Sequence, residues 1–177
     1  MPSQPPMDGM TVSGRPMLEP VTIHLTVNGA QRAVSVDPAS SLADVLRQEL
    51  GLTALHLGCE HGVCGACNVM VDSASVRACL LLAVQAEGLD VRTLEGLTDD
   101  PRVQALTAAF RERRALQCGF CTPGLLMSAL DLLQCDPAPD AETVRDALSG
   151  NICRCTGYQP IVDAVLDAAA HLRANAA

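Results

Sequence analysis

The sequence predicts an α+β fold in which a small domain with a β-sheet precedes a bundle of four helices. Three observations predict it: an alternating, β-branched hairpin near the start, helical spacing of apolar residues in the second half, and a set of four cysteines in each half. The 177 residues are 49% hydrophobic but only 2% aromatic. Because large side chains are few, a bound metal cluster can supply order that each small core would otherwise lack.

The first domain is predicted to combine a hairpin, a helix, a metal loop and two further strands. Asn28-Gly29, between two alternating runs, predicts a tight hairpin turn. Ser40 or Ser41 is the expected helix cap, and Gly51 ends the helix. In chain order the elements are the strands Val21–Val27 and Arg32–Val36, the helix Leu42–Leu50, the loop Gly58–Cys67, and the strands Asn68–Asp72 and Leu89–Leu94.

The second domain is predicted to be helical, with short connections that favour a bundle. Thr122 is the expected cap of its second helix, with Pro123 at the first helical position, and Asp140 is the expected cap of the third. The predicted helices are Pro101–Ala115, Thr122–Gln134, a helix from Asp140 to Leu148, and a helix from Pro160 to about Arg173. The domains therefore span residues 21–97 and 98–177, after a tail over residues 1–20 that its Pro, Gly, Ser and Met content predicts to be flexible.

Charge and hydropathy exclude several function classes. The net charge of −8 argues against a nucleic-acid binder, which usually carries a basic patch. No apolar stretch approaches the roughly 20 residues that cross a bilayer, and the first residues do not resemble a signal peptide. We therefore expect a cytoplasmic protein, whose nine cysteines are thiols or metal ligands and not disulfides.

The first set of cysteines has the spacing C-x4-C-x2-C-x11-C, and comprises Cys59, Cys64, Cys67 and Cys79. Its first three members match the loop of plant-type 2Fe–2S ferredoxins. Two irons need two thiolates each, so a loop must curl round the cluster while a separate element supplies the fourth sulfur. Glycines between the ligands allow such a loop to turn tightly and bring its amides close to the sulfurs.

The second set has the spacing C-x2-C-x31-C-x-C, and comprises Cys118, Cys121, Cys153 and Cys155. Both pairs lie beside predicted helix ends or tight turns, and helix N-termini favour an anionic cluster. The set is therefore predicted to hold a second 2Fe–2S cluster. Cys135 is left over and is predicted to be a free thiol in the core.

Alternatives remain open on the cysteines alone. Zinc also binds four cysteines, so a zinc-stabilised interaction module is one, and the spacing of the second set does not distinguish the two metals. A Rieske-type role for His56 or His61 is a weaker alternative, since all four cysteine positions are present. No catalytic triad, phosphate loop or dinucleotide motif is found, so no catalytic residue is assigned.

At these cysteines the chain resembles the small iron–sulfur subunit of the xanthine oxidase family of molybdenum hydroxylases. The stretches that carry the resemblance are GCEHGVCGAC, RACLLLAVQAEG, LQCGFCTPGLLMS and LSGNICRCTGYQPIVDAV. The resemblance implies a β-grasp, plant-type 2Fe–2S ferredoxin-like domain over residues 21–97 and a four-helix bundle with its own 2Fe–2S cluster over residues 98–177. Asn68 replaces a common Thr, and Ser73-Ala74-Ser75 replaces a usual glycine turn.

The resemblance also implies an electron-transfer role within an oxidoreductase. Electrons would pass from molybdopterin on a large subunit through the bundle cluster and the loop cluster to FAD on a medium subunit. Gln117 and Cys155 would lie close to the molybdopterin. The implied assembly is a heterohexamer with two copies of each subunit, and this chain would have no substrate site of its own. A free-standing ferredoxin is the remaining alternative, although a shuttle needs only one cluster domain.

Overall fold

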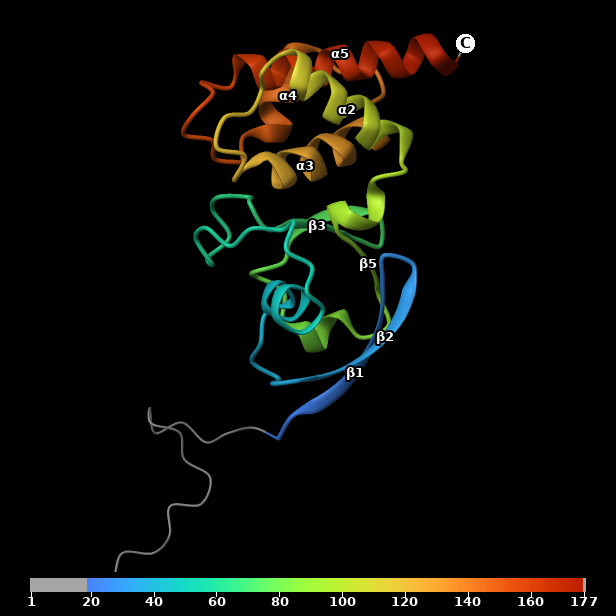
Figure 1. Cartoon of the computed structure of the whole chain (residues 1–177), viewed down its shortest axis with the longest axis vertical. Helices are drawn as coiled ribbons and strands as arrows, with labels where there is room; N and C mark the ends of the chain where they lie inside the picture. Colours follow the sequence, from blue (N-terminus) through green and yellow to red (C-terminus); the bar gives the residue numbers. More distant parts are fainter. Residues whose placement is uncertain (1–18, 177) are drawn as a thin grey trace, which may run out of the picture.

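The computed structural model describes residues 19–176, so the expectation for the tail over residues 1–20 lies almost wholly outside the described residues. The described chain is a mixed α/β structure, with a five-stranded sheet below and a helical part above (Figure 1). Within these residues, no helix is both long enough and apolar enough to cross a membrane.

The predicted hairpin is confirmed. Strand β1 (Val21–Val27) pairs antiparallel with β2 (Ala30–Val36) along its whole length. Asn28 and Gly29 both have positive φ, 53° and 79°, which is the geometry of a two-residue hairpin turn. Alternate residues of β1, among them Ile23 and Leu25, are buried, so the alternating pattern faces one side of the sheet to the core.

The sheet has the order β2-β1-β5-β3-β4. Strands β3 (Asn68–Val71) and β5 (Asp90–Arg92) lie where strands were predicted, although β5 is shorter because Leu94–Leu97 forms a 3-10 turn, η3. Strand β4 (Ala74–Arg77) was not predicted as a strand. It pairs antiparallel with β3 across a turn in which Asp72 and Ser73 have φ of 47° and 73°, so this turn forms without the usual glycine.

The predicted helix over 42–50 is irregular. A short α1 (Leu42–Asp44) continues as a π-turn, η1 (Val45–Glu49). Of the two candidate caps, Ser41 takes the role, because its Oγ accepts a hydrogen bond from the Asp44 amide at 3.1 Å. This segment and the 3-10 turn η2 (Ala83–Ala86) pack with the sheet in a core that includes Leu42, Leu46 and Val69.

Four helices make up the helical part. They are α2 (Pro101–Glu112), α3 (Thr122–Cys135), α4 (Ala141–Leu148) and α5 (Gln159–Ala176). Asp140 caps α4 as predicted, accepting from the Thr143 amide at 2.8 Å. The predicted cap of α3 is wrong: Cys121 occupies the cap position, and Thr122 is the first helical residue with its buried hydroxyl unpartnered. Helix α2 ends before Ala115, and α5 runs beyond Arg173.

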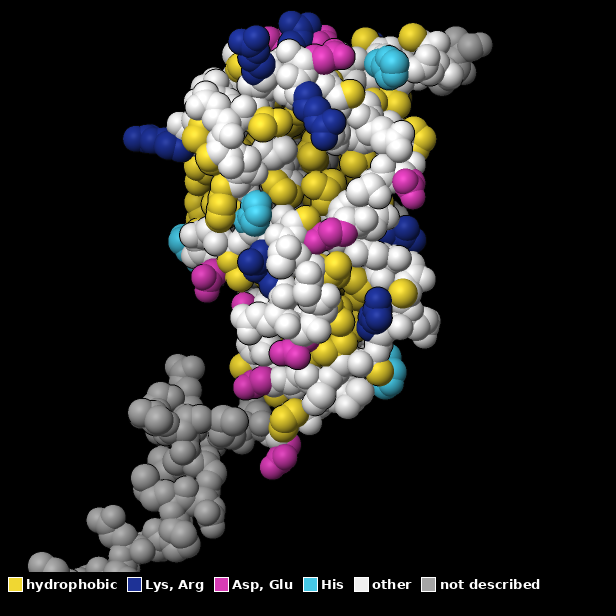
Figure 2. Space-filling view, viewed as in Figure 1, with side chains coloured by type: hydrophobic (Ala, Val, Ile, Leu, Met, Phe, Trp, Pro, Cys, Tyr) yellow, Lys and Arg dark blue, Asp and Glu magenta, His cyan; other side chains and the backbone are white. Residues whose placement is uncertain are grey.

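The helices share one apolar core that includes Phe110, Leu125, Leu130 and Ile161. Helix α3 lies next to β3, so it joins the helical part to the sheet (Figure 1). In Figure 2 charged side chains are scattered over the viewed face, while hydrophobic side chains gather over the helical part. The cysteine loops lie where these two parts meet.

Candidate metal centres

The β3–β4 hairpin brings together two of the first four cysteines, Cys67 and Cys79. Cys67 directly precedes β3 and Cys79 follows β4, so antiparallel pairing brings them to the same end of the hairpin. The Ala78 amide donates to the Cys67 carbonyl at 3.3 Å. The side chains of Cys67 and Cys79 interact with each other. Burial is the main cause that raises the pKa of the Cys67 thiol to about 12. A cation bound here must therefore displace a proton from that sulfur.

The loop before β3 wraps round Cys59. Glycine is required at Gly62 and Gly65, whose φ angles are 81° and 70°. The amides of Val63 and Cys64 donate to the Cys59 sulfur at 3.3 and 3.4 Å. Backbone hydrogen bonds, chiefly from His61 and then Cys64, lower the pKa of Cys59 to about 6. The predicted loop with inward amides is therefore present, and it favours a thiolate at this position.

The second four cysteines come from the loop before α3 and from the α4–α5 connection. The sulfurs of Cys118 and Cys155 lie 3.6 Å apart. Cys121 and Cys153 also interact, and burial raises the pKa of Cys121 to about 12. Burial acts to raise the pKa of Cys153 too, but hydrogen bonds, led by the Thr156 hydroxyl at 3.2 Å, lower it on balance.

Each set is thus arranged as two pairs of sulfurs. Cys59 lies with Cys64 and Cys67 with Cys79 in the first, and the second has the pairs described above. Over residues 19–176, no three or more His, Cys, Asp or Glu side chains converge as the ligands of a single metal ion. Two pairs of thiols on each loop set fit a group with two irons, each of which takes two sulfurs.

Direct hydrogen bonds join the two loop sets. The Ile152 amide, next to Cys153, donates to the Cys64 carbonyl at 2.9 Å. Asn151, which is 2% exposed, donates from its side chain to the Gly65 carbonyl at 3.2 Å. The Asn151 carbonyl also accepts from the Tyr158 hydroxyl, at 3.0 Å. Asn151 therefore binds the first loop through its side chain and stabilises the turn of the second loop through its backbone carbonyl.

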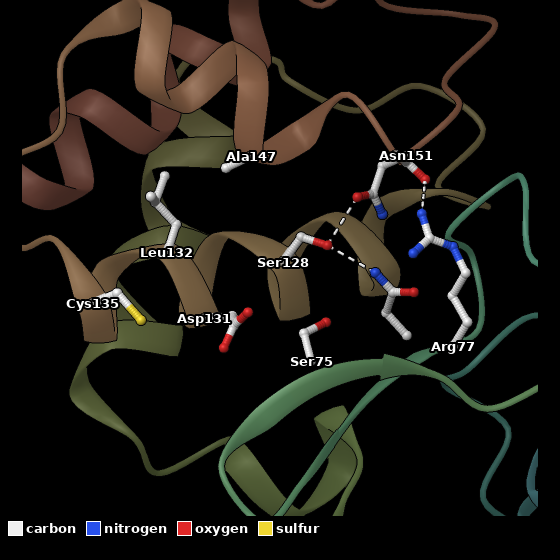
Figure 3. A pocket seen from close by; sticks show the side chains of 10 residues that line it. Ser75, Arg77, Ser128, Asp131, Leu132, Cys135, Ala147 and Asn151 are labelled. Atoms are coloured by element: carbon white, nitrogen blue, oxygen red, sulfur yellow. Dashed lines mark hydrogen bonds between the residues drawn. The ribbon is translucent and has the colours of Figure 1, made fainter. Parts of the chain in front are cut away.

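Figure 3 shows the polar network that supports this junction. Ser128 on α3 accepts from the Asn68 side-chain amide and donates to the Asn151 side-chain oxygen, both at 2.8 Å. A cavity of about 340 Å³ adjoins the network between the β3–β4 hairpin and helices α3 and α4. Arg77 enters from β4 and donates to the Gly150 carbonyl at 2.8 Å. No periodic pattern in the sequence predicts these contacts, because their partners lie 23 to 73 residues apart.

His56 and His61, the two histidines beside the first loop, both contact backbone carbonyls. The His56 ring stacks on Phe120, with centroids 4.7 Å apart, and its Nδ1 is 2.7 Å from the Phe120 carbonyl. His61 Nδ1 contacts the Cys59 carbonyl and not a sulfur. The stack links the start of the first loop to the segment between Cys118 and Cys121, a role that the sequence analysis missed.

The remaining candidate residues have clear positions. The side-chain amide of Gln117 donates to the Cys155 carbonyl at 2.9 Å, so these two residues lie together. Cys135 is free, but it is exposed at the end of α3. The prediction of a core thiol at Cys135 is therefore wrong, because the residue lies on the side of the last helical turn that faces away from the core.

Replacing Asn151 with alanine is expected to loosen both loop sets. The change removes the side-chain donor from the Gly65 carbonyl, which keeps only the longer 3.4 Å bond from the Asn68 amide. It also leaves the Ser128 hydroxyl without its acceptor, and the two losses together cost about 1–3 kcal/mol. The temperature of half-maximal loss of cluster absorbance measures this in the assembled protein. Asn175→Ala, at an exposed position of α5, is the control and should cost under about 0.5 kcal/mol. Equal midpoints for the two variants would contradict the bridging role of Asn151.

Comparison with known families assigns iron–sulfur binding to both halves. Residues 25–95 match the family described as "2Fe-2S iron-sulfur cluster binding domain", and residues 93–166 match "[2Fe-2S] binding domain". The two sets of cysteines fall one in each matched region and fit two 2Fe–2S clusters.

Similar proteins cover most of the chain. The nicotine 6-hydroxylase small subunit of Paenarthrobacter nicotinovorans is 56% identical, over 84% of this chain and 89% of that protein. The xanthine dehydrogenase iron-sulfur-binding subunit of Escherichia coli O157:H7 is 43% identical, over 84% and 94%. The crystal structure of quinoline 2-oxidoreductase from Pseudomonas putida 86 superposes with a TM-score of 0.84 at 47% identity, over 89% of this chain and 98% of that one. The chain belongs to the small iron–sulfur subunits of the xanthine oxidase family of molybdenum hydroxylases.

Proposed function

We propose that this chain relays electrons from molybdopterin on a large subunit, through two 2Fe–2S clusters, to FAD on a medium subunit. The observation that carries the proposal is the meeting of the two cysteine sets, where the Ile152 amide hydrogen-bonds the Cys64 carbonyl at 2.9 Å. Each cluster, when bound, supplies one-electron redox chemistry. Direct contact between the loops supports transfer between the two sites within this one chain.

The proposed ligands are the eight paired cysteines. In the first domain Cys59 and Cys64 would hold one iron, and Cys67 and Cys79 the other. In the second domain the proposed pairs are Cys118 with Cys155 and Cys121 with Cys153. The arrangement in pairs favours these assignments over a single zinc ion, which needs four sulfurs about one point. We further propose that residues 21–97 and 98–177 are the two cluster domains, the second a four-helix bundle of α2–α5.

Exposed apolar side chains beside the cysteines support docking to partner subunits. Leu80 is 62% exposed next to Cys79, and Ile152 is 51% exposed next to Cys153. Val63 and Phe120 are also exposed within the two loops. Apolar side chains of this size, gathered round otherwise polar loops, are typical of surfaces that become buried on assembly.

The proposed partners follow from the family. Gln117 and Cys155 would face the molybdopterin of the large subunit, and the first domain would face the flavin of the medium subunit. We propose two copies of each subunit in the complex, and a cytoplasmic location stays a prediction. The catalytic site for substrate would lie on the large subunit.

Metal analysis and EPR spectroscopy test the proposal. The protein purified without oxygen with its partners should contain about four irons and four labile sulfides per copy of this chain. Reduction should give two distinct 2Fe–2S signals. Stoichiometric zinc in a colourless chain would support the zinc module instead. A chain that carries both clusters but never co-purifies with molybdenum would support a free-standing ferredoxin.

A further inference from the structure

We propose that Arg77 is a built-in counter-charge for the two clusters, which raises their reduction potentials from the junction between the loops. The inference rests on the proposed function, because it concerns how this chain would hold the electrons that it relays. It goes beyond the ligand assignment, because Arg77 is not a ligand and acts through its charge.

The first observation is that Arg77 has no carboxylate partner within residues 19–176. The chain has 20 acidic residues against 12 basic ones. Elsewhere Arg92, Arg102 and Arg113 each pair with an aspartate. Arg77 is partly buried, yet it forms no ion pair among residues 19–176, and its buried Nε has no hydrogen-bond partner. A partly buried cation is costly unless an anion compensates it.

The second observation is the position of the guanidinium group. Its Nη2 donates to the Gly150 carbonyl at 2.8 Å, three residues before Cys153. The same Gly150 oxygen lies against the first loop, because a Cβ built on Gly65 would be 2.6 Å from it. Arg77 itself is two residues before Cys79. The cation therefore lies at the contact between the two cysteine sets.

The third observation is the charge of the surroundings. Asp131 is the carboxylate that lines the same cavity, and Figure 3 shows it on the far side of Ser128 from Arg77. The neutral side chains of Asn68, Ser128 and Asn151 line the same cavity. The compensating anions are then the thiolate-ligated clusters, which are negative and gain one more negative charge on reduction. A fixed cation nearby favours the reduced state.

The test is a redox titration of each cluster, followed by EPR, in the assembled protein. Arg77→Gln removes the charge and keeps a side-chain amide that can still donate to Gly150. We expect both midpoint potentials to become more negative, with the reduction equilibrium changed about ten-fold, which is about 59 mV for a one-electron couple. Arg77→Lys keeps the charge and should retain most of the potential.

The matched control is Arg32→Gln. Arg32 is exposed on β2, at the opposite edge of the sheet from β4, and its loss changes the net charge by the same amount. Its potentials should stay at the wild-type values. Equal potentials in Arg77→Gln and Arg32→Gln would overturn the proposal. So would an equal shift in Arg77→Lys and Arg77→Gln, because the geometry of the hydrogen bond would then be the cause.

A second pair of variants keeps the test usable if Arg77→Gln does not assemble. Ser75 lies on β4 and lines the same cavity. Ser75→Asp adds a carboxylate near Arg77 and should shift the potentials negative relative to Ser75→Asn, which has the same shape. No difference between these two would also overturn the proposal. Absence of both EPR signals in the wild-type protein would instead contradict the proposed function.

Discussion

Replacement of Cys64 with serine is expected to abolish the first cluster and to spare the second. Cys64 is the proposed partner of Cys59 on one iron, and a hydroxyl is a much poorer iron ligand than a thiolate. The contact with the second loop should survive, because it uses the Cys64 carbonyl and the Ile152 amide and not the side chain. The iron content should fall from about four to about two per chain.

EPR and turnover assays separate the consequences of this change. One of the two 2Fe–2S signals should disappear while the other keeps its g values. Electron transfer to the flavin side should be lost, while oxidation of substrate at molybdenum remains partly possible with an artificial acceptor. Cys135→Ser is the matched control, since Cys135 is exposed and belongs to neither set. Both signals unchanged in Cys64→Ser would refute the ligand assignment.

Local patterns predicted the elements that depend on neighbouring residues. The alternation in Val21–Val27 with Asn28-Gly29 specified the β1–β2 hairpin, and Asp140 specified the start of α4. The cap of α3 could not be read in the same way. Thr is a common cap residue, so the sequence pointed to Thr122. In the structure Cys121, a member of the second set of cysteines, occupies the cap position instead.

Contacts between distant segments could not be predicted from periodicity. Cysteine spacing predicted two sets, one in each half of the chain, but it did not show that the loops touch. That contact depends on Asn151 with Gly65, 86 residues apart, and on Arg77 with Gly150, 73 residues apart. Strand β4 was missed for a similar reason. It has only four residues of mixed polarity, so it carries no clear alternating pattern, and it is stabilised by pairing with β3.

Gly124 should be the position in the helical part at which a single added methyl group is least tolerated. A Cβ at Gly124 would lie 2.1 Å from the Gly65 carbonyl oxygen and 3.0 Å from the Ala66 Cα. Both neighbours are backbone atoms of the first cysteine loop, so neither can rotate away as a side chain could. Alanine within a helix normally stabilises it by about 1 kcal/mol relative to glycine. Here the overlap must separate α3 from the loop, and overpacking typically costs about 1–3 kcal/mol.

Overlap with fixed backbone atoms puts the overpacking cost at the upper end of its range, about 3 kcal/mol, and the gain in helix propensity offsets about 1 kcal/mol of it, so we expect Gly124→Ala to lower stability by about 2 kcal/mol. Heating should bleach the clusters at a midpoint about 4–8 °C lower than in the wild type. Gly88→Ala is the control: its φ is 78° but no atom lies within 4 Å of the added Cβ, so only backbone strain of about 1 kcal/mol is expected. If Gly124→Ala is as stable as the wild type, α3 does not pack directly on the first loop. The two cluster sites would then lack the rigid contact on which the proposed relay depends, because Gly65, which this helix covers, also receives the hydrogen bond from Asn151.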